Sequence, residues 1–381
     1  MPLRDALTSS WDHVQGFLLP HLREEVGPLT ESHTRLVVVL DMVCIEASLP
    51  PWRAWPGRPP ADRPALARAF IAKAVLNLPT TAALIERLLV DQRLRRLVGW
   101  ERVGQVPGAS TFSRAFAEFA ESNLPARVHE ALIKRTLGGD HVVGHIARDA
   151  TAIPAREKPV KVEKPQADQP RRKRGRPRKG EVAPAKEPRR LERQMQQTLP
   201  QMLADLPTHC SIGTKRNAKG HTTSWIGYKL HIDTADGDIP VSCLLTSASL
   251  HDSQAAIPLA TMTAARVLNL YDLMDKAYDA PEIWEKSRLL GHVAIIDRHP
   301  RNVAGGKTAI AAEARAQRCV GFQLPQDVRY NERSSAERVN ANLKDNCGGN
   351  TVRVRGAAKV YCHLMFGIVA IAAEQVLRLV T

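Results

Sequence analysis

The spacing of apolar residues divides the chain into a helical part and a part rich in strands. Up to about residue 137, apolar residues recur at helical spacing, as in residues 36–45 and 65–78. From residue 141 on, the side chains of residues 143 to 151 alternate between two faces, which is typical of a strand. The pattern predicts an all-α N-terminal domain at residues 1–137 and an α/β domain at residues 138–381.

Two capped helices stand out in the N-terminal domain. One follows Pro79 with Thr80 as its predicted N-cap, and another is predicted to be capped by Ser110. This pair is either a helix-turn-helix reader of DNA, with Arg114 as a contact residue, or a small bundle whose phenylalanines form the core. Three phenylalanines fall on one face of the second helix, namely Phe112, Phe116 and Phe119.

The second domain reads as a mixed sheet with helices against it. The elements come in the order strand, insertion, hairpin, helix, strand, helix, strand, helix. This is the order of a ribonuclease-H-like fold. A tight turn at Asp236-Gly237 joins the hairpin strands, and the alternation of residues 226–233 predicts a half-buried first strand. Later strands are expected at residues 239–246, 270–274 and 292–297, and helices at residues 253–268, 280–290, 332–344 and 357–379.

A basic insertion interrupts this domain at about residues 156–221. Residues 156–193 hold 15 Lys+Arg against 6 Asp+Glu, a net charge of +9, and their richness in proline and charge predicts disorder in this first part. The run Arg174-Gly175-Arg176-Pro177 has two interpretations. It is either an AT-hook whose arginines enter a narrow minor groove, or a solvated linker that binds any DNA by counterion release.

The net charge of the 381-residue chain is +15, with a pI near 9.8. A charge of this sign points to nucleic acid as the first candidate partner and to an anionic membrane surface as the second. Residues 364–373, the most apolar stretch, have about half the ~20 residues that a membrane span needs. Residues 1–11 lack the pattern of a signal peptide. The sequence therefore predicts a cytoplasmic protein with no membrane partner.

The six cysteines are scattered and show no CxxC spacing. Reduced thiols are the plain interpretation. Cys210 and His221 remain a hypothetical pair of zinc ligands, although no second pair accompanies them.

Three carboxylates fall at places where they can converge on this fold. Asp149 ends the first strand, Asp275 ends a later one, and Glu337 lies on the helix after the sheet. Converging carboxylates repel one another unless a cation is bound, and hard oxygen ligands suit Mg²⁺. The three residues are therefore candidate metal ligands and catalytic residues.

Asp275 is chosen over two neighbouring aspartates. Asp272 lies three residues earlier on the strand, so its side chain points to the opposite face. Asp279 reads as the N-cap of the following helix, with Glu282 three residues on. Asp275 has no comparable structural role in the sequence, and a carboxylate at a strand end calls for a cation.

The helix that carries Glu337 shows a narrow charged stripe. At 100° per residue, the spacing i, i+4, i+7 and i+11 keeps four side chains on one line. The stripe suits a metal-and-phosphate surface, but charge spacing alone also fits a solvated, salt-bridged helix face. Its members are Arg333, Glu337, Asn340 and Lys344.

Four residues around this helix resemble the Y-(2)-R-(3)-E-(6)-K signature of insertion-sequence transposases of the four/five superfamily. They are Tyr330, Arg333, Glu337 and Lys344, with all three spacings present. Residues 225–253 look like the hairpin region of that family, and residues 149–151 and 275–279 resemble its two aspartate motifs. Residues 57–119 resemble the helical domain that precedes these catalytic domains. The resemblance covers about four fifths of the chain.

The resemblance implies a DNA transposase with two-metal chemistry. Asp149 and Asp275 would hold two Mg²⁺ ions, with Mn²⁺ as a substitute, and Glu337 would complete one of the sites. Arg333, Asn340 and Lys344 would contact DNA, with Tyr330 packed beside them.

The partners implied are the terminal inverted repeats and target DNA, with no small-molecule substrate. The N-terminal domain would bind DNA ends and support a homodimer on paired ends, in a bacterial protein that lies on the nucleoid. Two alternatives stay open: a transposase relic that holds DNA without cutting it, and a ribonuclease-H-fold nuclease that cuts without joining.

Overall fold

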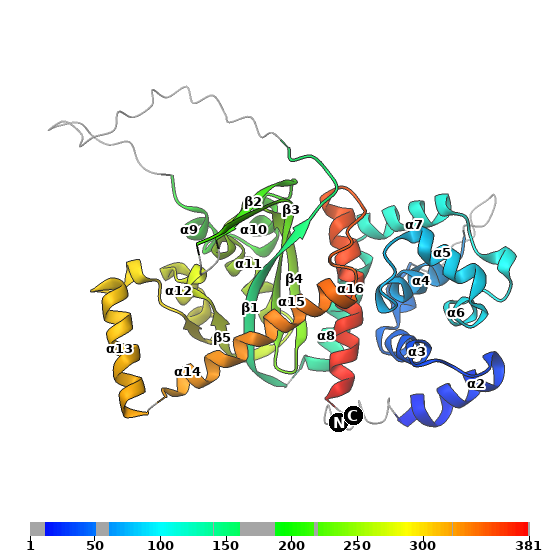
Figure 1. The fold of residues 1–381 in the computed structure, drawn as a ribbon, viewed down its shortest axis with the longest axis horizontal. Coiled ribbons are helices and arrows are strands. Elements are labelled where there is room, and N and C mark those ends of the chain that lie inside the picture. Colours follow the sequence, from blue (N-terminus) through cyan, green and yellow to red (C-terminus); the bar gives the residue numbers. More distant parts are fainter. Residues whose placement is uncertain are drawn as a thin grey trace.

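The computed structural model describes residues 12–50, 61–139, 141–160, 187–216, 220–321 and 323–379. A helical N-terminal part is followed by a mixed sheet with flanking helices, and the long helix α16 (Ala357–Arg378) stands between the two (Figure 1). This confirms the predicted fold class. Arg174 and Arg176 lie outside the described residues, so the AT-hook interpretation stays a prediction.

The N-terminal part is a bundle with its phenylalanines in the core. Phe112 and Phe119 are buried and pack on Phe70, whose ring also lies 5.6 Å from that of Phe366 on α16. This confirms the core interpretation of these side chains. The helices are α2 (Leu19–Val26), α3 (Glu31–Val43), α4 (Arg63–Val75), α5 (Thr81–Val90), α6 (Gln92–Val98), α7 (Ala109–Glu121) and α8 (Leu124–Leu137), preceded by a π-helix at Val14–Leu18.

One of the two predicted helix caps is confirmed and one is wrong. The hydroxyl of Thr80 accepts a hydrogen bond from the amide of Ala83, 3.0 Å away, at the start of α5. Ser110 does not cap α7, because this helix begins at Ala109 with Gly108 in the N-cap position. The helix begins two residues earlier than it would with Ser110 as its N-cap, and the N-cap residue Gly108 forms no side-chain cap bond.

Within the described residues the sheet has six strands in the ribonuclease-H-like order. β1 pairs antiparallel with β3 and parallel with β5, β6 continues parallel to β5, and both β2 and β4 pair antiparallel with β3. The strands are β1 (Val142–Pro154), β2 (Ser211–Arg216), β3 (Thr222–Ala235), β4 (Ile239–Ser247), β5 (Leu268–Met274) and β6 (Val293–Ile296).

Helices cover both faces of the sheet. On one face α15 (Ser334–Asn346) and α16 pack on Tyr228, Leu230 and Ile232 of β3. The other face is covered by α11 (Ala256–Ala264) and α12 (Pro281–Leu289). The short helices α9 (Arg190–Gln194) and α10 (Leu199–Asp205) pack against them. The prediction that the strand of residues 226–233 is half-buried is therefore wrong, since residues 230–235 are buried on both faces.

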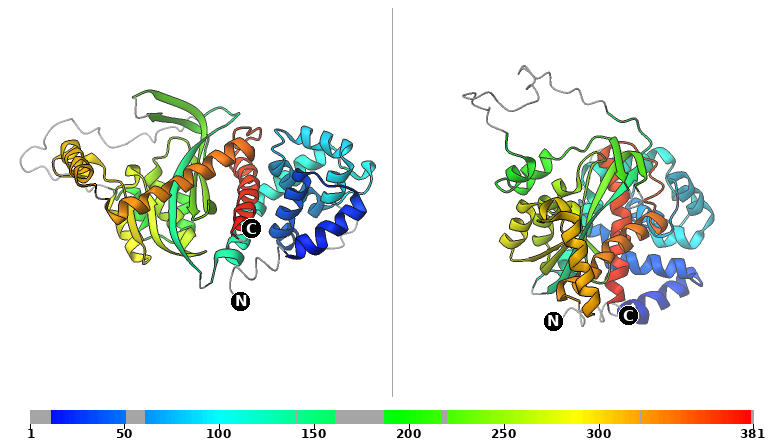
Figure 2. Two further views of the ribbon diagram at one scale, coloured as in Figure 1. Left: turned by 60° about the horizontal axis from the view of Figure 1, so that its bottom comes forward. Right: turned by 60° about the vertical axis from the view of Figure 1, so that its left-hand side comes forward.

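α16 belongs to both parts of the molecule. It packs on α3, α4, α7 and α8 on one side and on β4 and α15 on the other, and it keeps this position in both views of Figure 2. By length and composition it is long enough to cross a membrane, unlike the shorter apolar stretch noted in the sequence. However, 83% of its most apolar window is buried inside the protein, as expected of a core helix.

A close approach fixes α15 against α16. Gly367 lies where a Cβ atom would come within 2.8 Å of both the Cys347 carbonyl oxygen and a methyl group of Leu343. Only glycine allows the two helices to touch at this point. The position of the helix that carries Glu337 is therefore set by the molecular core.

Several elements have no counterpart in the sequence prediction. α9, α10 and β2 lie within the region assigned to the insertion, and α13 (Gly306–Val320) and α14 (Pro325–Tyr330) fill the stretch before α15. α13 stands away from the body in Figure 2 and buries no residue. Its sequence lacks a wide apolar stripe, which is the signal that identifies a helix packed on a core.

Candidate active site

The first two candidate carboxylates lie side by side on neighbouring parallel strands. Arg148 of β1 pairs with Met274 of β5, so Asp149 and Asp275 form the next pair in this register. Neighbouring strands are about 4.8 Å apart, and the Asp149 side chain contacts Asn340 of α15. The strand order, rather than any sequence proximity, brings the two aspartates together.

Asp275 also has a local role that the sequence did not reveal. One of its carboxylate oxygens accepts a hydrogen bond from the amide of Ala277, 2.9 Å away, and caps the 3₁₀ turn Lys276–Tyr278. The interpretation that Asp275 lacks a structural role is therefore wrong. The cap occupies Oδ1 and directs the carboxylate at the strand end.

The side chain of Asp149 is partly buried and interacts with several charged residues of the site. Burial, the largest cause, and the charge of Asp275 raise the pKa of Asp149 to about 6, although Arg333 and Lys215 act to lower it. Asn340 of α15 is 6% exposed and donates its side-chain amide to Asp149 Oδ2 at 3.0 Å. Asn340 thus positions the carboxylate, and its contact with DNA stays a prediction.

Glu337 does not join the other two carboxylates. Its side chain is 57% exposed and accepts a hydrogen bond from Arg333, one turn earlier on the helix, at 2.6 Å. Among the described residues no three His, Cys, Asp or Glu side chains lie close enough together to hold a metal ion. Without a cation the carboxylates repel, and the guanidinium of Arg333 is the better partner for Glu337.

The residues at the site nevertheless fit a divalent cation. Asp149 and Asp275 offer adjacent hard oxygen ligands, and burial together with the charge of Asp275 raises the pKa of Asp149. The side-chain oxygen of Asn340 is buried without a hydrogen-bond partner among the residues that the structure describes. A bound cation would offset the repulsion and add a partner for such an oxygen.

Basic side chains surround the pair. Lys344 of α15 is half-buried, and burial together with the charge of Lys215 lowers its pKa, while Asp149 acts to raise it. The guanidinium of Arg333 lies 5.6 Å from the ring centre of Tyr330. Burial raises the pKa of Tyr330. Tyr330, Arg333 and Lys344 therefore lie around Asp149 and Asp275, and Glu337 is linked to them through Arg333.

Asp272 serves the core beneath the site rather than the site itself. Its side chain is buried on the opposite face of the sheet and accepts hydrogen bonds from Ser287 at 2.7 Å and Asn269 at 3.1 Å. His292 lies 3.3 Å from the same carboxylate. This placement agrees with the face expected from the strand alternation.

Asp279 holds a loop and is not a helix cap. α12 has Ala280 as its N-cap residue, without a side-chain cap bond, so the predicted capping role is wrong. The Asp279 carboxylate instead accepts hydrogen bonds from the amide of His299 at 2.8 Å and from the side chains of Asn302 and Trp284. The loop after β6 supplies two of these donors, and sequence proximity could not indicate them.

A buried ion pair next to Asp149 was not predicted from the sequence. Arg148 donates two hydrogen bonds to Asp233 of β3, at 2.8 and 2.7 Å, and both side chains are at most 1% exposed. Thr263 of α11 donates to the same carboxylate at 2.6 Å. Burial lowers the pKa of Arg148, but the charges of Asp233 and Asp272 outweigh burial and raise it. The only sequence signal was a charged residue beside Asp149 in an apolar strand.

Two further predicted residues lie away from the site. Arg114 is exposed on α7, where its guanidinium donates to the carbonyl of Ser110. Cys210 is buried and donates its thiol to the carbonyl of Glu157, and burial raises its pKa, which disfavours a zinc-binding thiolate. All six cysteines are free, as expected.

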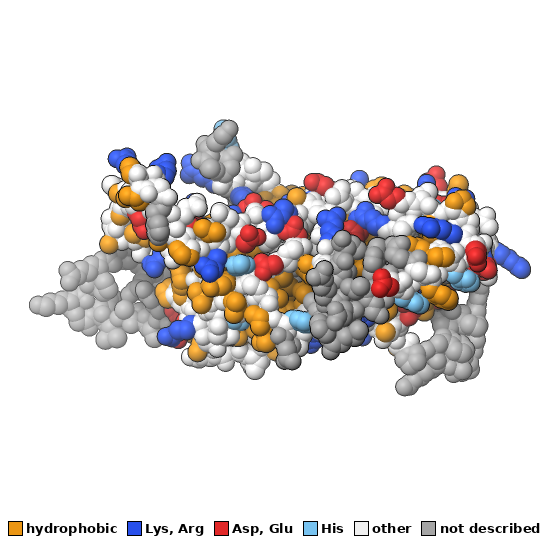
Figure 3. Space-filling model, turned by 90° about the horizontal axis from the view of Figure 1, so that it is seen from below, with side chains coloured by type: hydrophobic (Ala, Val, Ile, Leu, Met, Phe, Trp, Pro, Cys, Tyr) orange, Lys and Arg blue, Asp and Glu red, His pale blue; other side chains and the backbone are white. Residues whose placement is uncertain are grey.

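The described residues form no single basic patch on the face of the protein that Figure 3 shows. Lys and Arg side chains are interspersed there with Asp and Glu. By contrast, residues 161–186 hold ten Lys+Arg against three Asp+Glu, a net +7. Nearly half of the net charge therefore sits in one short segment of sequence.

The sheet order and the paired carboxylates define a protein of the ribonuclease-H-like DDE class. Residues 144–372 match the family model described as Transposase DDE domain, and residues 25–118 match a model described as Transposase domain (DUF772). The chain belongs to the DDE transposase family. Comparison with curated proteins and with solved structures gives no match.

Proposed function

We propose that this transposase cleaves DNA at the ends of an insertion sequence and joins the ends to target DNA, with Mg²⁺ as the metal and paired ends held by a homodimer. The observation that carries the proposal is the pairing of Asp149 with Asp275 beside Arg333 and Lys344. Membership of the four/five superfamily is part of the proposal and rests on the Tyr330–Lys344 spacing.

In this proposed reaction, each residue of the site would have one task. Asp149 and Asp275 would hold the divalent metal, which when bound would supply activation of the attacking oxygen and stabilisation of the leaving oxygen at phosphorus. Asn340 keeps the Asp149 carboxylate in place. A DNA phosphate is a strong partner for Arg333, and its arrival releases Glu337 to complete the ligand set. Lys344 binds a second phosphate.

One assay tests the function and separates it from its alternatives. The protein is incubated with Mg²⁺, labelled element ends and a plasmid target. Joined product supports a transposase, and cut ends without joining indicate a nuclease. A shifted band without cutting indicates a DNA-binding relic and contradicts the proposed activity.

Glu337→Gln is expected to lower cleavage at least a hundredfold while DNA binding and folding stay close to wild type. The amide keeps the shape of the side chain but lacks the charge that completes a metal site. Its matched control is Glu332→Gln, which alters an exposed glutamate five residues earlier in the chain. Cleavage by Glu337→Gln within a few-fold of wild type, measured with labelled ends, would remove Glu337 from the ligand set.

Replacing residues 161–186 by a neutral Gly/Ser linker of equal length should weaken binding to all DNA. The slope of log K against log salt should fall by roughly 0.9 for each DNA phosphate that the segment neutralises in the wild type. This segment is chosen because Arg190 and Arg193, further along, form ion pairs with Asp205 that the linker leaves intact. An unchanged slope would mean that the segment does not touch DNA.

The AT-hook interpretation has its own test. Arg174→Ala with Arg176→Ala should weaken binding to AT-rich duplexes more than to GC-rich ones, because a narrow minor groove attracts inserted arginines. Equal reductions on both duplexes would favour a solvated basic linker.

A further inference from the structure

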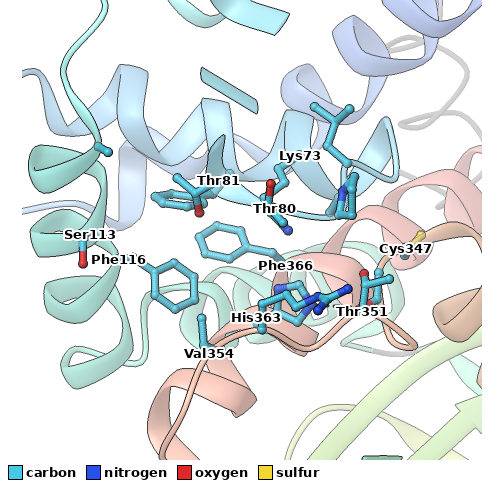
Figure 4. Close-up of a pocket in the computed structure, with 17 residues that line it drawn as sticks. Lys73, Thr80, Thr81, Ser113, Phe116, Cys347, Thr351, Val354, His363 and Phe366 are labelled. Carbon is cyan, nitrogen blue, oxygen red and sulfur yellow. Dashed lines mark hydrogen bonds between the residues drawn. The ribbon is translucent and has the colours of Figure 1, made fainter. Parts of the chain in front are cut away.

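A cavity of about 270 Å³ lies where the N-terminal helices meet the segment between α15 and α16 (Figure 4). Its apolar walls include Phe116 of α7 and Phe366 of α16. Lys73 of α4 and Thr80 at the start of α5 lie next to each other, with Thr351 and His363 on the opposite side. The cavity therefore joins residues from both parts of the chain.

Lys73 is a buried cation without an acidic partner. Its side chain is 8% exposed, and no described residue forms an ion pair or hydrogen bond with its ammonium group. Burial lowers the pKa of Lys73 to about 8, so the group is still largely charged at neutral pH. Buried charges in proteins are normally paired, since an isolated one is unfavourable.

The rest of the lining suits an anion. Among the described residues that line the cavity there is no carboxylate, whereas the exposed guanidinium of Arg353 and the hydroxyls of Thr80 and Thr81 are present. The hydroxyl of Thr351 donates to the carbonyl of Gly348 at 3.2 Å. His363 is held by the carbonyl of Gly348 at 3.0 Å, and burial lowers its pKa to about 4, so it is neutral. The cavity thus combines two cations with hydroxyl donors.

We propose that this cavity binds a phosphate group, and that the DNA backbone supplies it; the choice of DNA rests on the proposed function. Cys347, which lines the cavity, follows directly on α15, ten residues after Glu337. Ten helical residues span about 15 Å, the length of four to five base pairs at about 3.4 Å each. A duplex that runs along α15 from Glu337 has a backbone phosphate within this distance.

The first arm of the test uses inorganic phosphate and the full-length protein. Thermal unfolding is followed while phosphate replaces chloride at constant ionic strength and pH 7. Wild type should be stabilised, and Lys73→Met should bind phosphate about ten- to a hundredfold more weakly, as expected when a charge-assisted hydrogen bond is removed. Lys286→Met, which alters another partly buried lysine on α12, should respond as wild type does.

The second arm uses a mixed-sequence duplex in a salt titration without metal. Lys73→Met should lower the salt slope by about 0.9, the value for one neutralised phosphate. Arg353→Gln, at an exposed position, should weaken binding in the same direction and serves as a second variant if Lys73→Met does not fold.

The two arms together decide the source of the phosphate. If the variants bind the duplex more weakly than wild type, DNA supplies the phosphate. If they bind only inorganic phosphate more weakly and the duplex as wild type does, the cavity is a phosphate site for a small molecule. Identical behaviour of wild type, Lys73→Met and Arg353→Gln in both arms overturns the proposal. Neither arm measures cleavage. A protein that fails to cut DNA, but whose binding of phosphate and duplex is weakened by Lys73→Met, would contradict only the proposed function.

Discussion

Asp149→Asn and Asp275→Asn are each expected to lower metal-dependent DNA cleavage by a factor on the order of a thousand or more. A divalent ion contributes several kcal/mol of transition-state stabilisation, and each substitution removes an anionic ligand from an adjacent pair. The measurement is single-turnover cleavage of labelled ends in Mg²⁺. The matched control is Asp279→Asn, which alters an aspartate that binds a loop and should cost some stability but leave most of the activity.

The stability of Asp149→Asn gives an independent readout. The pKa of Asp149 is raised from 3.8 to about 6 in the folded protein. Protonation of this group therefore stabilises the folded state, and this contribution is fully present below about pH 4. That contribution is lost as the pH rises through 6. At pH 8 without metal, Asp149→Asn should therefore be more stable than wild type, by up to about 3 kcal/mol. A variant that unfolds earlier than wild type at pH 8 would show that the carboxylate is satisfied without a cation.

Arg148→Met should be the most destabilising single change beneath the site. It leaves Asp233 buried without its guanidinium partner, and breaking a buried pair in this way costs about 3–5 kcal/mol. The strands β1 and β3 that position Asp149 would lose their strongest polar link. Unfolding in urea should show the lower stability, and activity should fall with the folded fraction.

The double variant Arg148→Met with Asp233→Leu tests the cause. If the destabilisation comes from an unpaired buried carboxylate, removal of that carboxylate should recover much of the stability, since apolar replacements of buried pairs are often tolerated. A double variant as unstable as Arg148→Met would locate the cause in packing instead. A destabilisation below about 1 kcal/mol in the single variant would mean that water reaches Asp233.

The sequence predicted the elements whose apolar period is strong, and the choice of Asp275 over Asp272 and Asp279 as a metal ligand stays a prediction. The alternation along β1 and β5 placed Asp272 and Asp275 on opposite faces, as the structure has them. The helix bearing Glu337 and the long helix α16 were also predicted, because their patterns run over many residues. These are properties of single segments, which a sequence displays directly.

What the sequence could not show depends on partners far along the chain. Asp233 pairs with Arg148, which is 85 residues away, and the loop that binds Asp279 follows a different strand. The exposed helix α13 escaped notice because it packs on no core. Convergence of all three carboxylates was inferred from their places at two strand ends and on the adjoining helix. Glu337 instead pairs with Arg333, four residues earlier in the chain.

Binding of Mn²⁺ tests the central claim, that Asp149 and Asp275 form a metal centre. Free Mn²⁺ is measured by electron paramagnetic resonance as it is titrated into the protein with a duplex DNA present, for wild type, Asp149→Asn, Asp275→Asn and Asp279→Asn. Wild type and Asp279→Asn should bind the ion, and the other two variants should bind it at least tenfold more weakly. Equal binding by all four proteins would contradict the assignment of Asp149 and Asp275 as metal ligands.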